Sequence, residues 1–421
     1  MTDHGGLHHP SETDKWSPRV WHRRVSRPVT VWILVFILVG LVHPFVPSSR
    51  WLLIHIFALG ILTNSITVWS QNLTERFLHR RLDDSERPAQ LLRSRLLNLC
   101  VVLVLVGMLP GPAQQWAWWI SAAGAAGVAG VLAWHGAVIA RQIRAAGPHQ
   151  RFRPAVDFYV ASAGCLVVGA LLGALLVSDL QGAWQNRALL AHVMLNVFGF
   201  VGFAAAGSLT VLFPAMWRIN GTLGKPSAML IAGCAGLGLA VAGVVGGHGV
   251  TAGIGMLVYA ASWAYALQGW ISALLGVRGE RKGRVTYWSL SALASVTWLF
   301  VFCVSFAARL LTSGESLSGL QMPVIPLLLG FAAQLLFGTM SYLLPTTMGG
   351  GPTATRAGLA ELNRAGVTRA VLFNAALVCW LAVENSVAAI LCSLVAFGCL
   401  VAFLPLMVRG VKVQRAVITA R

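Results

Sequence analysis

Acidic residues are scarce in this sequence: Asp and Glu number 13 against 31 Lys and Arg, and charged residues make up only 10% of 421 positions. Hydrophobic residues make up 57%, and the mean hydropathy is +0.73. So few charges are not enough to cover the surface of a water-soluble protein of this length. The composition therefore excludes a soluble enzyme and a nucleic-acid-binding protein, and it indicates an integral membrane protein.

Cysteine patterns are also lacking. The chain has seven cysteines, an odd number, with no Cys-x-x-Cys pair and no spacing typical of a zinc site or a disulfide framework. All of them fall in apolar stretches, so we interpret them as small buried side chains. Carboxylates are nearly absent from the apolar stretches too, which argues against a proton- or sodium-coupled relay of acidic groups.

Long apolar runs take the place of the missing charge. Runs of about 18 to 25 residues are each long enough to cross a hydrocarbon core of roughly 30 Å as a helix. We predict an all-α polytopic membrane protein with a membrane domain over 29–408, flanked by a histidine-containing tail over 1–28 and a second tail over 409–421. The twelve predicted spans are 29–46, 51–71, 96–110, 116–140, 155–178, 189–216, 228–247, 249–276, 286–311, 322–345, 367–384 and 387–408. The longest connections are expected at about 72–95 and 346–366.

The basic residues are distributed unevenly between the two ends of these spans. Of the 31 Lys and Arg residues, 28 lie in the two tails or in the connections that follow every second helix. The other connections hold only Arg50, Arg187 and Arg309. By the positive-inside rule, both termini are expected in the cytoplasm, with the chain in the cytoplasmic (inner) membrane. No signal-peptide pattern precedes the first span, so we expect an uncleaved anchor.

Three helix ends on the predicted cytoplasmic side are similar in sequence. They are NSITVWSQ (Asn64–Gln71), GSLTVLFP (Gly207–Pro214) and GTMSYLLP (Gly338–Pro345), separated by 143 and 131 residues. The second and third match each other more closely than either matches the first. Because each begins at the same place in a set of four helices, the spacing predicts three parallel repeats of four helices.

Histidines are the candidate ligands inside the membrane domain. His55 lies near the outer end of the second span and His192 near the outer end of the sixth. Two imidazoles at a similar depth on different helices suit an axial pair for haem or two corners of a copper site. Asn196, one turn after His192, could orient that imidazole. The alternative for each is a lone interfacial histidine that snorkels to the membrane surface or bonds a neighbouring hydroxyl.

Further histidines are weaker candidates. His43 and His248 lie at the outer ends of the first and seventh spans, where they could ligate a metal. His135 is near the opposite face and is interpreted as structural. In the N-terminal tail, His4, His8 and His9 could chelate copper, although histidine-rich tails also occur without metal.

A family resemblance rests on these residues. Twelve helices in three parallel sets of four, with histidines near the outer ends of the second and sixth, resemble the haem-copper oxidase subunit I superfamily. The stretch AHVMLNVFGFVGFAAAGSLTVLFPAMWR (Ala191–Arg218) is similar to the helix of NnrS-like haem and copper membrane proteins in which His-x-Met is followed by Gly-x-Leu-Thr and Pro. WLLIHIFALGILTNSITVWS and QLLFGTMSYLLPTTMGGGP resemble helices of the membrane module of actinobacterial copper nitrite reductase and multicopper oxidase homologues.

The resemblance implies a haem protein, with or without copper. His55 and His192 would be axial haem ligands, or haem and copper ligands, with Met194 as a soft alternative donor. Arg50 and Arg187 would neutralise the propionates. The chain departs from the pattern at several positions. Leu190 and Met194 stand where relatives often have a second histidine, the seventh span has only His248, and the tenth has none. A complete binuclear centre and a proton-pumping oxygen reductase are therefore not expected.

The sequence leaves three functions open. The first is electron transfer or the handling of nitric oxide and nitrosative stress, with a separate copper redox enzyme or electron carrier as the outer-face partner, besides the lipid bilayer. The second is a permease or copper-handling transporter without haem, favoured by 44 glycines and by intramembrane amides at Asn64, Gln268, Gln334 and Asn374. The third is a scaffold that keeps the fold without a metal.

Overall fold

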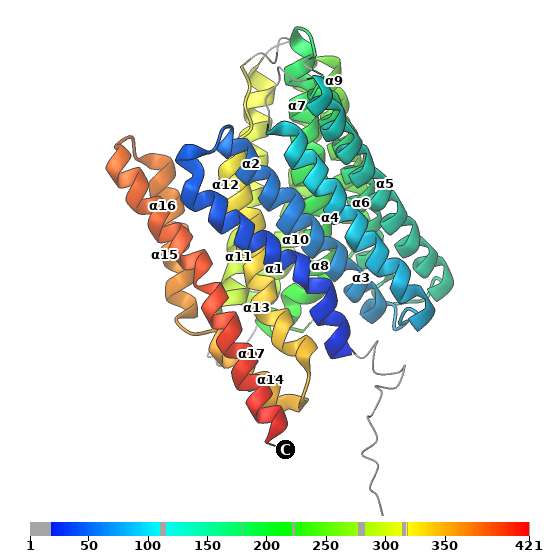
Figure 1. Ribbon diagram of the computed structural model, residues 1–421, viewed down its shortest axis with the longest axis vertical. Helices are drawn as coiled ribbons and strands as arrows, with labels where there is room; N and C mark the ends of the chain where they lie inside the picture. Colours follow the sequence, from blue (N-terminus) through cyan, green and yellow to red (C-terminus); the bar gives the residue numbers. More distant parts are fainter. Residues whose placement is uncertain are drawn as a thin grey trace, which may run out of the picture. The chain divides into compact units, whose positions relative to one another are not determined.

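The computed structural model describes residues 18–109, 115–178, 180–220, 224–276, 283–313, 317 and 319–420. Across these residues the regular structure is helical, without strands (Figure 1). Twelve helical segments of the described chain are long and apolar enough to cross a membrane. The prediction of an all-α, multi-pass membrane protein is therefore confirmed. The tail histidines His4, His8 and His9 lie outside the described residues.

The chain divides into two compact units, Met1–Gly147 and Pro148–Arg421. The membrane helices of the first unit are α1 (Pro18–Val42), α2 (Ser49–His55), η3 (Ile56–Thr63), α3 (Asn64–Phe77), α4 (Arg87–Met108) and α5 (Gln115–Ala146). The second unit contains α6 (Arg153–Leu176), α7 (Ala183–Met194), η5 (Leu195–Gly202), α8 (Phe203–Trp217), α9 (Pro226–Gly246), α10 (Gly249–Leu275), α11 (Tyr287–Thr312), α12 (Val324–Pro326), η6 (Leu327–Ala333), α13 (Gln334–Met348), α14 (Gly351–Leu362), α15 (Gly366–Ala382), α16 (Ser386–Val401) and α17 (Phe403–Thr419).

Glycines bring neighbouring helices into backbone contact within each unit. In the first, α4 and α5 run side by side (Figure 1). If Gly124 carried a Cβ atom, that atom would lie only 2.7 Å from the backbone N of Val104, so a larger residue would not fit there. In the second, α9 and α10 are packed in the same way, and a Cβ at Gly236 would lie 2.5 Å from the backbone N of Tyr259. Small residues permit this close approach, and the resulting van der Waals contacts stabilise helix association in a bilayer.

Within the described ranges, three of the long membrane helices contain a π-helical segment, namely η3, η5 and η6. Each segment includes a glycine that faces a side chain of the preceding membrane helix. A Cβ at Gly60 would lie 2.7 Å from the Trp32 ring on α1, one at Gly199 would lie 2.6 Å from Cys165 on α6, and one at Gly330 would lie 2.8 Å from the Trp298 ring on α11. Each hydrogen bond of a π-helical segment spans one residue more than in an α-helix, and such segments are frequent at functional sites.

These contacts recur at nearly constant spacing. Trp32, Cys165 and Trp298 are 133 residues apart in both steps, whereas the three glycines are 139 and 131 apart. Aligned on the glycines, Asn64 corresponds to Phe203 and not to Gly207, a shift of one turn from the sequence-based alignment. Three parallel repeats remain a prediction. The recurring contacts indicate how the repeats would be aligned, with the three glycines at equivalent positions.

The connections are shorter than the sequence suggests. The expected connection at 72–95 is reduced because α3 continues to Phe77 and α4 begins at Arg87. The expected connection at 346–366 contains α14, which packs on α17. There Gln414 is fully buried, and its Nε2 donates to the carbonyls of Pro345 and Gly349, 2.9 Å away in each case. These contacts outside the apolar runs order a segment that hydropathy marks only as polar.

Candidate functional site

The imidazole of His192 lies in a recess on α6 made by two glycines. Its Nδ1 is 2.8 Å from the carbonyl oxygen of Gly169. A Cβ at Gly173 would lie 2.9 Å from His192 Cε1, and one at Gly169 would meet Asn196 Oδ1. Gly169 and Gly173 are one helical turn apart, so together they admit the imidazole and the amide between α6 and the helix formed by α7 and η5.

The hydrogen bond to Gly169 sets the tautomer of His192. A carbonyl only accepts, so Nδ1 carries the proton and Nε2 carries the lone pair. The Nδ2 of Asn196 lies 3.3 Å from both ring nitrogens. The Asn196 Oδ1 is buried and has no hydrogen-bond partner in the part of the chain that the structure describes. The sequence-based pairing of His192 with Asn196 is therefore present as a direct contact.

His55 ends α2, immediately before η3. Its Nδ1 lies 2.8 Å from the carbonyl oxygen of Trp51, which again assigns the proton to Nδ1 and the lone pair to Nε2. The imidazole stacks on the Trp51 ring with a centroid separation of 3.9 Å and an interplanar angle of 21°. This half-buried ring is thus held from both its edge and its face by one residue of the preceding turn.

The two weaker histidine candidates are exposed. His43 begins the short 3₁₀ helix η2 (His43–Phe45), and its Nδ1 lies 2.8 Å from the carbonyl oxygen of Gly40. His248 precedes α10, and its backbone N–H donates to the carbonyl of Gly243 at 2.7 Å. His43 therefore shares the tautomer of His55 and His192.

Met194 and the two arginines lie in different surroundings. Met194 is fully buried, and it follows His192 by two residues, which places it about 200° further around the helix. Arg187 reaches the C-terminal end of α9, where its Nη1 lies 3.5 Å from the carbonyl of Val245 and its guanidinium contacts Gly247. A cation there favours the helix dipole. Arg50 is exposed on α2.

The structure brings together only part of the predicted site. In the second unit, His192 and Asn196 touch, while Arg187 and His248 both adjoin the turn between α9 and α10. In the first unit, His43 lies on η2, and Arg50 and His55 lie on α2, the element that follows it. In the described part of the chain, no three His, Cys, Asp or Glu side chains are grouped so as to hold a metal ion. A closed cage of three or four protein ligands is therefore not formed by those residues.

Sequence reasoning missed a buried polar network in the first unit. Ser70 Oγ lies 2.9 Å from His135 Nε2, and Gln71 Nε2 donates to Gln142 Oε1 at 3.1 Å. Arg87 and Glu75 form an ion pair at 2.9 Å, with side-chain exposures of 5% and 12%. The signal for this network is the helical spacing of polar residues along one face of α3, at Thr67, Ser70, Gln71 and Thr74. The interpretation of His135 as structural agrees with its hydrogen bond to Ser70.

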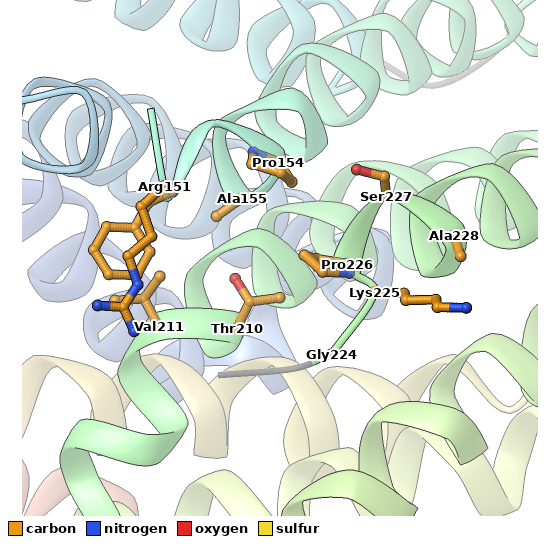
Figure 2. Close-up of a pocket in the computed structure, with 11 residues that line it drawn as sticks. Arg151, Pro154, Ala155, Thr210, Val211, Gly224, Lys225, Pro226, Ser227 and Ala228 are labelled. Atoms are coloured by element: carbon orange, nitrogen blue, oxygen red, sulfur yellow. The ribbon is translucent and has the colours of Figure 1, made fainter. Parts of the chain in front are cut away.

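A cavity of about 490 Å³ lies in the second unit at the start of α6 and α9. Figure 2 shows Arg151 at one side and Lys225 at the other, with Thr210 and Pro226 between them. The Arg151 guanidinium lies 5.2 Å above the Phe152 ring. A second cavity of about 290 Å³ shares Gly224 with the first and is lined by Gln268 of α10.

Comparisons with known proteins place the chain in no established group. No protein-family model matches it, and no curated protein matches it significantly. The resemblance to the haem-copper oxidase superfamily therefore remains a prediction that rests on the motifs of three helices.

Proposed function

We propose that this chain is a haem-binding membrane protein with an oxidase-like fold that acts in electron transfer or in the handling of nitric oxide. One observation carries the proposal: His43, His55 and His192 each have Nδ1 within 2.8 Å of a backbone carbonyl, which assigns the lone pair to Nε2. Histidines that ligate a metal through Nε2 have their other ring nitrogen fixed in this way.

The donor set fits haem better than a structural metal cage. A structural zinc site needs four protein ligands, whereas haem iron needs only one or two axial donors. We propose His55 and His192 as the residues that would hold it. When bound, haem supplies an iron centre for one-electron transfer or for binding a diatomic ligand. The Gly169 carbonyl would hold the His192 ring, and Trp51 would hold the His55 ring. The Asn196 Nδ2, 3.3 Å from His192 Nε2, would have to leave that lone pair to the iron.

The contacts of the other predicted residues favour different roles for them. Arg50 is exposed and could pair with a propionate, whereas the guanidinium of Arg187 already contacts the Val245 carbonyl at the end of α9. Met194 is fully buried on another side of its helix, which does not favour it as a ligand beside His192. Copper at His43 or His248 is a further proposal, supported by the exposure of both rings.

The spectra of the purified protein test this proposal. Wild-type protein from haem-replete cells should show a Soret band and sharp reduced α and β bands. His192→Ala and His55→Ala should each lose this low-spin spectrum. His149→Ala removes an exposed loop histidine and should keep it. A folded wild-type protein without bound haem would contradict the proposal.

The topology proposed with this function puts both termini in the cytoplasm and the two histidines near the outer face of the cytoplasmic (inner) membrane. It is supported by the distribution of Lys and Arg. A copper redox enzyme or electron carrier on the outer side is the partner that this arrangement would suit.

A permease or copper-handling transporter without haem is the second candidate. The cavity between Arg151 and Lys225 favours it, because a polar cavity at helix ends suits entry of a solute (Figure 2). Uptake of copper by vesicles, unchanged by His55→Ala in a protein without haem, would support this function over the first.

A further inference from the structure

Arg93, on α4 of the first unit, is a deeply buried cation. Its residue exposure is 6%, and among the described residues its Nη1 has no hydrogen-bond partner. No ion pair joins it to an acidic group in the described ranges, where Glu75 pairs with Arg87 instead. Glu86 and Arg141 act on Arg93 at longer range and with opposite signs. The packing partner of the guanidinium is the Trp134 ring, 5.4 Å away.

A small cavity adjoins this guanidinium. Its volume is about 30 Å³, and residues of α1, α3, α4 and α5 line it. One water needs a cavity of only roughly 10–15 Å³ measured in this way. The cavity therefore has room for a water or a monatomic ion.

The polar lining of the cavity offers hydrogen-bond donors. Arg93 supplies guanidinium N–H groups. Gln90 supplies its amide NH₂, because its Oε1 accepts from Arg87 Nη1 at 3.1 Å. Ser94 supplies a hydroxyl, and His135 lies at the far side with its Nε2 on Ser70 Oγ. None of the residues that line the cavity is acidic.

We propose that this cavity binds one small monovalent anion of the halide class, such as chloride. A buried charge needs a counter-charge, and a guanidinium surrounded by donors has none in its own lining. A water would satisfy one N–H but would leave the charge uncompensated. The bound anion would connect α4 and α5 with α1 and α3, and so stabilise the first unit. This site is separate from the proposed haem ligands.

Equilibrium dialysis against ³⁶Cl⁻ in gluconate buffer tests the proposal on the full chain in detergent. Wild-type protein should bind chloride saturably, with one ion per chain. Arg93→Gln should lose this binding. Arg95→Gln is the matched control, because Arg95 is exposed on the same helix, and it should bind like wild type. No saturable chloride, or equal binding by Arg93→Gln, would overturn the proposal and leave a water as the occupant.

A second variant guards against misfolding of Arg93→Gln. Ser94→Ala removes one hydroxyl donor and keeps the cation, so it should weaken chloride binding about 2- to 10-fold. The melting temperature of wild-type protein should rise with chloride and bromide concentration, as expected for a ligand that binds only the folded state. Gluconate, a bulky organic anion, at equal ionic strength should give no such rise. A melting temperature that is independent of the anion would contradict halide binding.

Discussion

At the scale of single residues, the space left by a missing Cβ decides how the candidate site is formed. Gly169 and Gly173 on α6 admit Asn196 and His192, and no side chain larger than hydrogen leaves that space unchanged. The imidazole is thus positioned by residues that carry no chemistry of their own. Their role was not predicted, because the 44 glycines of the sequence look alike until a neighbouring helix is in place.

Replacing Gly173 tests this dependence. In Gly173→Ala the new Cβ would lie 2.9 Å from His192 Cε1, so the imidazole must move or the helices must separate. We expect a loss of stability of about 1–3 kcal/mol, as for other overpacked interiors, measured by unfolding in detergent. Gly164→Ala on the same helix is the control, since its Cβ would meet nothing within 4 Å. Equal stability of the two variants would show that the recess is not needed.

Two tryptophan–asparagine hydrogen bonds are further residue-scale features. The Nε1–H of Trp32 donates to Asn98 Oδ1 at 2.6 Å, and that of Trp298 donates to Asn374 Oδ1 at 2.7 Å. Both indole rings also pack on a glycine of a π-helical segment, Gly60 and Gly330 respectively. Each tryptophan therefore joins three membrane helices.

Removing one of these donors should be costly. Trp298→Phe keeps most of the ring but leaves the Asn374 Oδ1 without the indole donor, so we expect destabilisation of about 1–3 kcal/mol. Trp116→Phe, at a tryptophan that is 57% exposed, is the control and should change stability little. Thermal unfolding of the two variants in the same detergent would measure the difference, and equal melting temperatures would refute the assigned role.

At the scale of elements, hydropathy was sufficient to predict the membrane spans. It did not predict the π-helical segments within the spans or the polar contacts between them. All twelve apolar runs correspond to membrane-length helices because burial in hydrocarbon requires internally satisfied backbone groups. The π-helical segments were not predicted, because they depend on packing against a neighbouring helix. The polar network around His135 was missed for a similar reason: it joins residues from three helices.

The contact between α14 and α17 supplies a prediction at this scale. Gln414→Ala would remove the donor to the carbonyls of Pro345 and Gly349. Unpaired buried carbonyls cost about 1–3 kcal/mol, so the turn before α14 should open more often. Limited proteolysis should then cleave near 349–351 faster than in wild type. Lys412→Ala, at an exposed position of α17, should be cleaved like wild type.

At the scale of the whole molecule, an even number of spans predicts that both termini share one face of the membrane. The Lys and Arg distribution predicts that this face is cytoplasmic. A fluorescent-protein fusion at either end should therefore be bright, and an alkaline phosphatase fusion at either end should be inactive. An active phosphatase fusion at one end alone would mean that one of the twelve segments does not cross the membrane.

The close pairing of α9 and α10 has a consequence for biogenesis. Their backbones touch at Gly236 and at Gly243, and only Gly247 and His248 separate the two helices. Such a pair leaves no room for lipid between its members and has too short a connection for either helix to settle alone. The two helices should therefore leave the translocon together as a preformed hairpin, while the rest of the second unit is still being synthesised.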